Sequence, residues 1–407
     1  MLTDDIAILR DLAERYVTIC DKPVMNERRD LWRRHNSLKR TPPLIYVRAW
    51  AWQEMPDSEL RCEDPFFRHY EDFFRQSLFR DTFADDFIFE PWVTVPAVRA
   101  IPPEGVWGLN APHTHSDEPR GSYVWDPPLK TEDDLARLHS PHHVVDEADT
   151  EQRVAKLHGA IGDLITIDLD RGPVYRMWQG DISTELARLR GLEQIMWDMM
   201  DRPAWLHKLL AHMRDGILRT HEEAEQAGDW SLSMHQNQAM PYAEELADPA
   251  PNSEPVARKD LWYYAASQET TAVGPKQFDE FMFQYQLPIM QPFGLVAYGC
   301  CEDLTRKIDV LRQLPNLRRI AVSPMANVAK CAAQIRQDYV LSYRPSPADM
   351  VGYGFNPARI RDILTRDLEA CAGCHVDITL KDVETVQGDV DRVRRWVEIA
   401  REVIAAV

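Results

Sequence analysis

Short apolar runs alternate with amphipathic helical stretches along most of this chain. Runs of β-branched and aromatic residues separated by helical patterns are typical of βα units, which place their strands side by side in a parallel sheet. Eight such runs in order predict a (β/α)8 TIM barrel of the α/β class. The predicted strands are residues 43–50 (PLIYVRAW), 172–178 (GPVYRMW), 230–235 (WSLSMH), 261–266 (LWYYAA), 295–298, 319–323 (RIAVS), 339–343 (YVLSY) and 375–380 (HVDITL).

The pattern also predicts how the rest of the chain is organised. We expect a single barrel domain over residues 1–407, with an N-terminal helical extension at 1–42. Residues 51–170 are rich in Pro, Trp and Phe and read as a long insertion after the first strand, covering one barrel mouth. Within it, the stretch DDFIFEPWVTVPAVRA can add a small accessory sheet.

Composition narrows the functional classes. The 407 residues carry a formal charge of −18, which argues against nucleic acid and anionic membrane surfaces as partners. No apolar run is long enough to span a bilayer, and the first residues lack the features of a secretory signal. The seven cysteines therefore read as reduced thiols of a cytoplasmic protein. Neither GxGxxG after the first strand nor a P-loop is present, so no nucleotide cofactor is expected.

Polar residues follow nearly every predicted strand. In barrel enzymes the chemistry lies where strands end and βα loops begin, so this pattern favours an enzyme. The candidate site residues, in chain order, are Arg48, Arg176, Trp178, Asp181, His235, Asn237, Glu269, Cys300, Cys301, Glu302, Arg344, Lys381, Asp382 and Glu384.

The segment Cys300-Cys301-Glu302 carries the most specific signal. Thiolates and a carboxylate can hold a soft or borderline metal, with His235 as a further ligand. Adjacent side chains diverge in an extended strand, so both sulfurs can reach one ion only if a turn begins there. A buried structural thiol and a nucleophilic thiol stay open as alternatives.

The other candidates have roles that follow from their chemistry. Arg48, Arg176 and Arg344 can clamp substrate carboxylates or form internal ion pairs. Glu269, Asp382 and Glu384 are candidate acid/base groups. The remaining polar and aromatic candidates, which are Trp178, Asp181, Asn237 and Lys381, are expected to bind substrate. Two further motifs, the CxxCH of residues 371–375 and the histidine pair at 113 and 115, read as ordinary thiols and as a loop pair.

From about Ser122 to the C-terminus the chain resembles the uroporphyrinogen decarboxylase superfamily, which includes corrinoid-dependent methyltransferases. The resemblance rests on GSYVWDPPLKTEDDLARL, RGPVYRMWQGD, ASQETTAVGPKQFDEFMFQYQLPIM, VAYGCCEDL and LSYRPSPADM. It implies a barrel with its substrate cleft at the carboxyl ends of the strands. The zinc-dependent methyltransferase branch carries His-x-Cys after the fifth strand and a later cysteine. Here the triplet is Tyr298-Gly-Cys300, and Ser342 lies near the later position. The decarboxylase motif Arg-Gln-Ala-Gly-Arg is absent between Arg33 and Arg48.

The resemblance implies a methyltransferase that acts on a small methylated substrate or a methyl-corrinoid partner, with zinc at Cys300 and the corrinoid carried by a partner protein. Decarboxylation of a polycarboxylate is the second hypothesis. A non-catalytic barrel that binds a corrinoid protein or a ligand is the third. The sequence leaves the oligomeric state open, a homodimer included.

Overall fold

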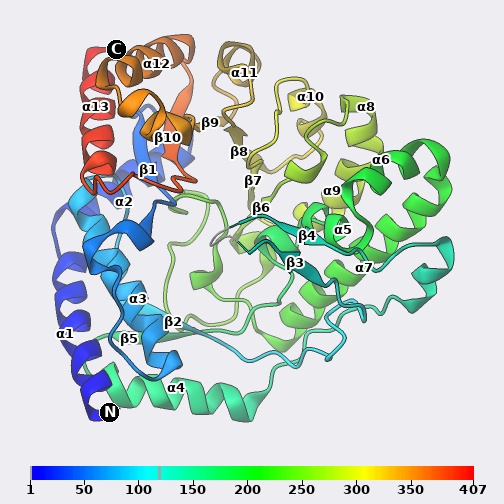
Figure 1. The fold of residues 1–407 in the computed structure, drawn as a ribbon, viewed down its shortest axis with the longest axis horizontal. Helices are drawn as coiled ribbons and strands as arrows, with labels where there is room; N and C mark the ends of the chain where they lie inside the picture. The colour runs from blue at the N-terminus through cyan, green and yellow to red at the C-terminus, as the bar shows by residue number, and fades with distance from the viewer. Residues whose placement is uncertain (1, 118–120) are drawn as a thin grey trace.

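A curled parallel β-sheet forms the centre of the molecule (Figure 1). A computed structural model describes residues 2–117 and 121–407. Its main sheet has six hydrogen-bonded strands in the order β1-β10-β9-β8-β7-β6, all parallel, and β2 and β5 form a separate parallel pair. The strands are β1 (Leu44–Val47), β2 (Trp92–Pro96), β3 (His113–His115), β4 (Tyr123–Trp125), β5 (Thr166–Asp170), β6 (Trp262–Ala265), β7 (Leu295–Tyr298), β8 (Leu317–Val322), β9 (Val340–Tyr343) and β10 (His375–Leu380).

Helices cover the outside of the sheet and build the N-terminal part of the chain (Figure 1). They are α1 (Leu2–Cys20), α2 (Val24–Asn36), α3 (Pro65–Arg80), α4 (Glu147–Ile161), α5 (Ser183–Arg190), α6 (Leu192–Asp201), α7 (Pro203–Ala227), α8 (Pro275–Phe278), α9 (Gln284–Met290), α10 (Ile308–Leu311), α11 (Val328–Ile335), α12 (Pro357–Ala370) and α13 (Arg392–Ala406).

The strands of the main sheet are buried on both faces. All four residues in each of β6, β7 and β9 are buried. This is expected for a parallel sheet that has helices packed on one face and core side chains packed on the other. The predicted α/β class and the six runs at 43–50, 261–266, 295–298, 319–323, 339–343 and 375–380 are confirmed as strands of this sheet.

The second and third predicted strands are wrong. Residues 172–178 begin with Gly-Pro, and a proline cannot donate to a strand ladder, so the strand ends earlier, at β5. Residues 230–235 contain a 3₁₀ turn in place of a strand. Side chains satisfy the backbone of that segment locally, because the N–H of Leu232 donates to Ser253 Oγ.

Loops, rather than further strands, occupy both free edges of the six-stranded sheet. At the β1 edge, the carboxylates of Asp86 and Asp85 accept the N–H groups of Ile45 and Val47 at 2.7 and 2.9 Å. At the β6 edge, the N–H of Trp262 donates to His235 Nδ1 at 3.1 Å. The ladder therefore stops at six strands, and the predicted eight-stranded closure is not seen in the strand pairing.

The predicted insertion, residues 51–170, forms helices and two separate pairs of strands. It contains α3, α4, β2 and β5, so the apolar stretch around β2 pairs with another strand of the same region. It also contains the antiparallel hairpin β3–β4, in which His113 lies opposite Trp125 and His115 opposite Tyr123. The hairpin is drawn in teal across the middle of Figure 1.

A buried charged network fastens α2 to the amino ends of the strands. His35 of α2 lies 3.2 Å from Asp377 of β10, and the same carboxylate accepts from Arg319 of β8 at 2.9 Å and from Ser342 of β9 at 2.8 Å. His35 and Asp377 are fully buried. The network therefore links one helix to three strands at the end of the sheet opposite the candidate site.

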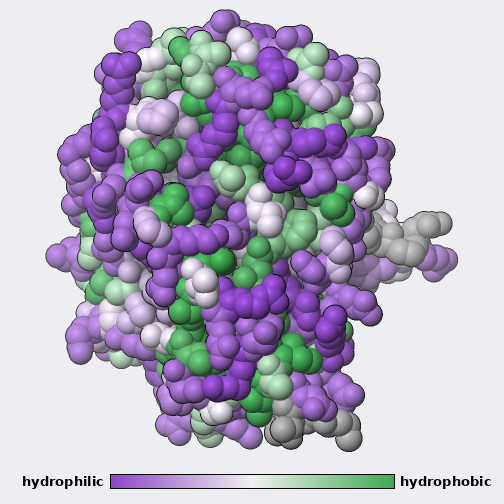
Figure 2. Space-filling model, turned by 90° about the vertical axis from the view of Figure 1, so that its left-hand side faces the viewer, coloured by the Kyte–Doolittle hydropathy of each residue, from purple (hydrophilic) through white to green (hydrophobic). Residues whose placement is uncertain are grey.

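The face at the left of Figure 1 is mostly hydrophilic, with hydrophobic side chains scattered over it (Figure 2). In the part of the chain that the structure describes, no helix combines the length and the apolar character needed to cross a bilayer.

Candidate functional site

The carboxyl ends of the parallel strands bring several of the predicted residues to one end of the sheet. Cys300 follows β7, Arg344 follows β9 and Lys381 follows β10, each within two residues of the strand end. In a parallel sheet these ends share one edge, so the three side chains can meet over the mouth of the curled sheet.

The two cysteine sulfurs converge because the chain turns directly after β7. Gly299 has a φ of +100°, a conformation that side chains disfavour. Cys300 Sγ then lies 3.6 Å from Cys301 Sγ. Cys300 is buried and Cys301 is exposed, so the pair runs from the interior to the surface. The turn that the sequence required for convergence is present.

The ammonium group of Lys381 lies against both cysteine sulfurs. Its Nζ lies 2.9 Å from Cys301 Sγ and 3.7 Å from Cys300 Sγ, and it also contacts the Asp382 carboxylate. The Lys381 side chain is buried, whereas that of Asp382 is half exposed. Arg344 adds a second positive charge nearby and donates to the carbonyl oxygen of Cys300 at 2.8 Å.

These contacts make the thiol pair acidic. The hydrogen bond from Cys301 and the charges of Arg344 and Lys381 hold the pKa of Cys300 far below its ordinary value, although burial opposes this. The pKa of Cys301 is raised, because its neighbour already carries the negative charge. Burial tends to lower the pKa of Lys381, but the Cys300 charge and Asp382 raise it overall. At neutral pH the pair thus holds one thiolate and one thiol beside an ammonium group.

The other predicted metal ligands do not join the cysteines. Glu302 is fully buried and accepts the N–H groups of Cys300 and Ser267 at 2.7 and 2.8 Å, so it braces the turn. Burial raises its pKa. His235 lies before β6, at the opposite strand end, and both its ring nitrogens are engaged, with the N–H of Trp262 and the carbonyl of Ala247.

The residues present do not fit the zinc site that the resemblance implies. Two sulfurs 3.6 Å apart could both lie about 2.3 Å from one zinc ion. However, Lys381 Nζ already fills the space beside both sulfurs, and an ammonium group and a dication repel each other. Among the described residues, no group of three or more His, Cys, Asp and Glu side chains is arranged to hold a metal ion.

Buried polar atoms without a partner surround the cysteine pair. Arg344 also donates to Gln238 Oε1 at 2.5 Å. Within the described residues, Arg344 Nε, Gln238 Nε2 and the hydroxyl of Tyr264 are buried and have no hydrogen-bond partner. Tyr264 packs in the same apolar cluster as Cys300. Buried polar atoms are usually satisfied, so atoms left over at a strand mouth suit a polar ligand.

A cleft of about 670 Å³ opens beside this cluster. Its walls include Trp178, Glu269, Arg188 and, from the hairpin, Tyr123 and Trp125. Trp178 meets Tyr264 edge to face at 6.0 Å between ring centroids, which connects the cleft to the cysteine pair. The volume is in the range of small-molecule sites.

One carboxylate, Glu269, lines the cleft, and a second, Asp181, lies buried behind it. Glu269 accepts from the hydroxyls of Ser183 and Thr184 at 2.8 and 2.9 Å. Asp181 is fully buried, and its Oδ2 has no partner in the described part of the chain. Burial, and after it the charge of Glu269, raise the pKa of Asp181 well above its ordinary value. Asp181 therefore keeps its proton to a higher pH than an exposed aspartate does.

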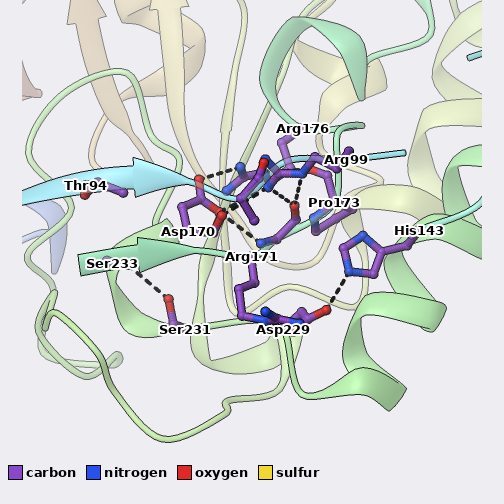
Figure 3. Close-up of polar contacts among 12 residues, drawn as sticks. Thr94, Arg99, His143, Asp170, Arg171, Pro173, Arg176, Asp229, Ser231 and Ser233 are labelled. Atoms are coloured by element: carbon purple, nitrogen blue, oxygen red, sulfur yellow. Dashed lines mark hydrogen bonds and ion pairs between the residues drawn. The ribbon is translucent and has the colours of Figure 1, made fainter. Parts of the chain in front are cut away.

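The three predicted arginines do not form one carboxylate clamp. Arg176 pairs with Asp170 at 2.6 Å, within a network that includes Arg99 (Figure 3). Arg344 bonds to a carbonyl and an amide, as described above. Arg48 lies over the Trp178 ring at 4.9 Å. Only Arg48 and Arg344 thus lie beside the cleft and the cysteines.

Two other candidates lie outside the cluster. Asn237 is buried in a local turn, where it donates to the carbonyl of Met240 and accepts from the N–H of Ala239. Glu384 is exposed, and its carbonyl oxygen accepts from Gln53.

Sequence reasoning missed the hydrogen bonds of Lys381 to sulfur and the polar residues Tyr264, Gln238, Ser267 and Gln286. For the hydrogen bonds of Lys381, the signal available in the sequence was a basic residue after the eighth predicted strand and another after the seventh. Ser267 and Gln286 form a buried network with Tyr298, in which Tyr298 Oη donates to Gln286 Oε1 at 2.7 Å. Tyr298 is fully buried in this network and acts as a structural group under the site.

The fold has a match among solved structures. No protein-family model matches the chain, and no curated protein matches its sequence. A methyltransferase from Methanosarcina mazei is similar in structure, with a TM-score of 0.50 and 10% sequence identity, over 92% of this chain and 98% of that one. At that identity the likeness shows the fold alone, which is that of an α/β protein with a curled parallel sheet.

Proposed function

We propose that this protein is an enzyme that transfers a methyl group from a small methylated donor, and that the Cys300–Cys301 pair receives it. The observation that carries the proposal is Lys381 Nζ within 2.9 and 3.7 Å of the two sulfurs at the carboxyl ends of the strands. A thiolate is the nucleophilic form of cysteine, and a neighbouring cation favours it at neutral pH. The fold shared with an archaeal methyltransferase supports the same reaction class.

The reaction needs only groups of this chain. The thiolate sulfur attacks the methyl carbon of the donor, a carbon–sulfur bond forms, and the bond from carbon to the leaving atom breaks. The leaving atom takes the bonding electron pair and then a proton from the Lys381 ammonium group, within reach of the same sulfurs. An acceptor nucleophile then attacks the methyl carbon, and the carbon–sulfur bond breaks with its electron pair on sulfur, which restores the thiolate. The Lys381 amine takes the proton that the acceptor loses. Zinc has no step in this scheme, because Lys381 lies against both sulfurs and the other two expected ligands, Glu302 and His235, are engaged elsewhere.

The surroundings have supporting roles. The cleft walls at Trp178 and Trp125 offer aromatic surface against which a methyl group of the donor can pack. Glu269 on its wall can accept a hydrogen bond from a polar end of the donor. We take β2 and β5 as the second and third strands of an irregular eight-stranded barrel that encloses the site, and a methyl-corrinoid protein as one candidate donor or acceptor.

The decarboxylase hypothesis has less support. It needs arginines that converge on substrate carboxylates, and Arg176 is already paired with Asp170. A non-catalytic ligand-binding barrel would not need an acidic thiol pair at the mouth.

Methyl labelling of the full-length protein tests the proposal. The purified chain is incubated with carbon-13 methyl donors, namely methylcobalamin, a methylated thiol and a methylated amine, and its peptides are mapped by mass spectrometry. We expect one labelled methyl group on the Cys300–Cys301 peptide with at least one donor. The label should disappear in the Cys300→Ser/Cys301→Ser double variant and persist in Cys374→Ser, which changes a half-buried thiol at the other end of the strands. Turnover of a donor by the double variant at the wild-type rate would overturn the covalent mechanism.

A further inference from the structure

We propose that Cys300 and Cys301 also form a reversible redox switch, closing as a disulfide between adjacent residues when a low-molecular-weight disulfide such as oxidised glutathione is the oxidant. The chemistry needs only the two thiols, and the regulatory consequence rests on the proposed function. Closing the bond removes the thiolate that receives the methyl group.

The sulfurs are already in contact. Their separation of 3.6 Å must shrink to about 2.0 Å to form a bond, which takes side-chain rotation together with an adjustment of the backbone between the two residues. The left-handed turn at Gly299 aims both side chains to the same side, whereas an extended chain would separate them. The geometry therefore requires no partner from another part of the chain.

Charge and access favour a first attack from the pair. Lys381 and Arg344 stabilise a thiolate that the two sulfurs share through their hydrogen bond. Cys301 is exposed, so an oxidant in solution can reach it, and Cys300 is buried directly behind it. This is the arrangement of an attacking thiol with a resolving thiol next to it.

The steps balance without any other reagent. The proton shared between the two sulfurs moves to Cys300, the Cys301 thiolate attacks one sulfur of the small disulfide, a mixed disulfide forms, and one small thiolate leaves and takes the proton from Cys300. The Cys300 thiolate then attacks Cys301 Sγ of the mixed disulfide, and the second small thiolate leaves. The protein dithiol has lost two electrons and two protons, and the oxidant has become two thiols.

Such a bond is easy to reverse. Neighbouring Cα atoms lie about 3.8 Å apart, whereas disulfides usually join Cα atoms about 4.4–6.8 Å apart. A strained disulfide is more readily reduced, which suits a regulatory rather than a structural bond. The pair should therefore reopen with dithiothreitol under conditions that leave the fold intact.

The test is a titration of the full-length protein with oxidised glutathione, read by intact mass and peptide mapping after acid quench. We expect the Cys300–Cys301 peptide to lose the mass of two hydrogen atoms, and dithiothreitol to restore it. Lys381→Met should slow the oxidation at neutral pH several-fold, whereas Lys330→Met, which changes an exposed lysine of α11, should not. Phenylarsine oxide, which bridges two close thiols, should bind one equivalent to the reduced protein and none to the oxidised one.

Two outcomes would overturn the switch. One is a stable mixed disulfide on Cys301 that does not resolve in the wild type. The other is equal arsenical binding by the wild type and by the Cys301→Ser variant. Neither readout depends on methyl transfer, so the switch can stand if the methylation proposal fails. If the pair oxidises while methyl labelling continues unchanged, the regulatory consequence alone is contradicted.

Discussion

At the scale of single residues, the site depends on a backbone turn that only one position makes possible. Gly299 has a positive φ, and a Cβ placed there would lie 2.7 Å from Leu304 Cδ1 and 3.1 Å from the Cβ of Ala321. The following two cysteines owe their convergence to this turn. The sequence contains the Gly-Cys-Cys triplet, but the φ of a glycine cannot be predicted from its sequence alone. The convergence of the two sulfurs could therefore be predicted only on the condition that a turn begins there.

Replacing Gly299 by alanine should open the pair. Backbone strain and the contact with Leu304 should lower the free energy of unfolding by about 1–3 kcal/mol. Arsenical binding should weaken at the same time, because the sulfurs separate. Denaturant unfolding and a phenylarsine oxide titration measure the two effects. Gly352→Ala is a matched control, since its added Cβ meets nothing within 4 Å. Unchanged arsenical binding in Gly299→Ala would show that the turn does not hold the sulfurs together.

Asp181 should make stability depend on pH. Because its pKa is raised in the folded state, the protein binds this proton more tightly than the unfolded chain does. That contribution is fully present below the unfolded pKa, near 3.8, and is lost as pH rises toward the folded value. Within this window the loss is about 1.4 kcal/mol per pH unit. The wild type should therefore lose stability relative to Asp181→Asn as pH rises. Urea unfolding at several pH values measures this change in unfolding free energy. Parallel curves for the two proteins would mean that Asp181 ionises normally.

At the scale of secondary-structure elements, periodicity predicted the strands that carry the site and failed where side chains replaced the ladder. The runs at β1 and β6–β10 are short, apolar and followed by helices, so pattern and structure agree. The run at 230–235 shows the same pattern, but there a side chain, Ser253 Oγ, accepts the N–H of Leu232 in place of a neighbouring strand. Lys381 was placed correctly after a strand. Its contact with sulfur was not predictable, because β10 and β7 are separated by two strands and meet only through the curl of the sheet.

The buried network that attaches α2 to the strands should contribute several kcal/mol to the free energy of unfolding. Asp377 is buried and accepts from His35, Arg319 and Ser342, so Asp377→Ala leaves a buried guanidinium without its carboxylate. Loss of one partner of a buried pair costs about 3–5 kcal/mol. Guanidinium chloride unfolding should show this loss, whereas Asp30→Ala, at an exposed position of the same helix, should change stability little. A small effect of Asp377→Ala would indicate that the network is dispensable.

At the scale of the whole molecule, the reactive pair is a product of folding. Cys300, Arg344 and Lys381 come from three strands spread over about eighty residues of sequence, and they meet only when the sheet is formed. The α/β fold that the sequence resemblance implied agrees with the fold of the structural match. The zinc expectation carried over from the resemblance does not agree with the ligands found here. In its place the molecule has a lysine, which supplies positive charge without a metal.

The claim that Lys381 activates the thiol pair is tested most directly by the rate of iodoacetamide labelling at Cys300 and Cys301 as a function of pH. The labelling is read by peptide mass in the wild type and in Lys381→Met. The account predicts that the folded wild type reacts with a midpoint well below that of a free cysteine, about 8.5. The midpoint should move upward in Lys381→Met, and it should reach the ordinary value when the wild type is unfolded in denaturant. An ordinary midpoint in the folded wild type, or the same midpoint in Lys381→Met, would contradict the claim that Lys381 activates the thiol pair.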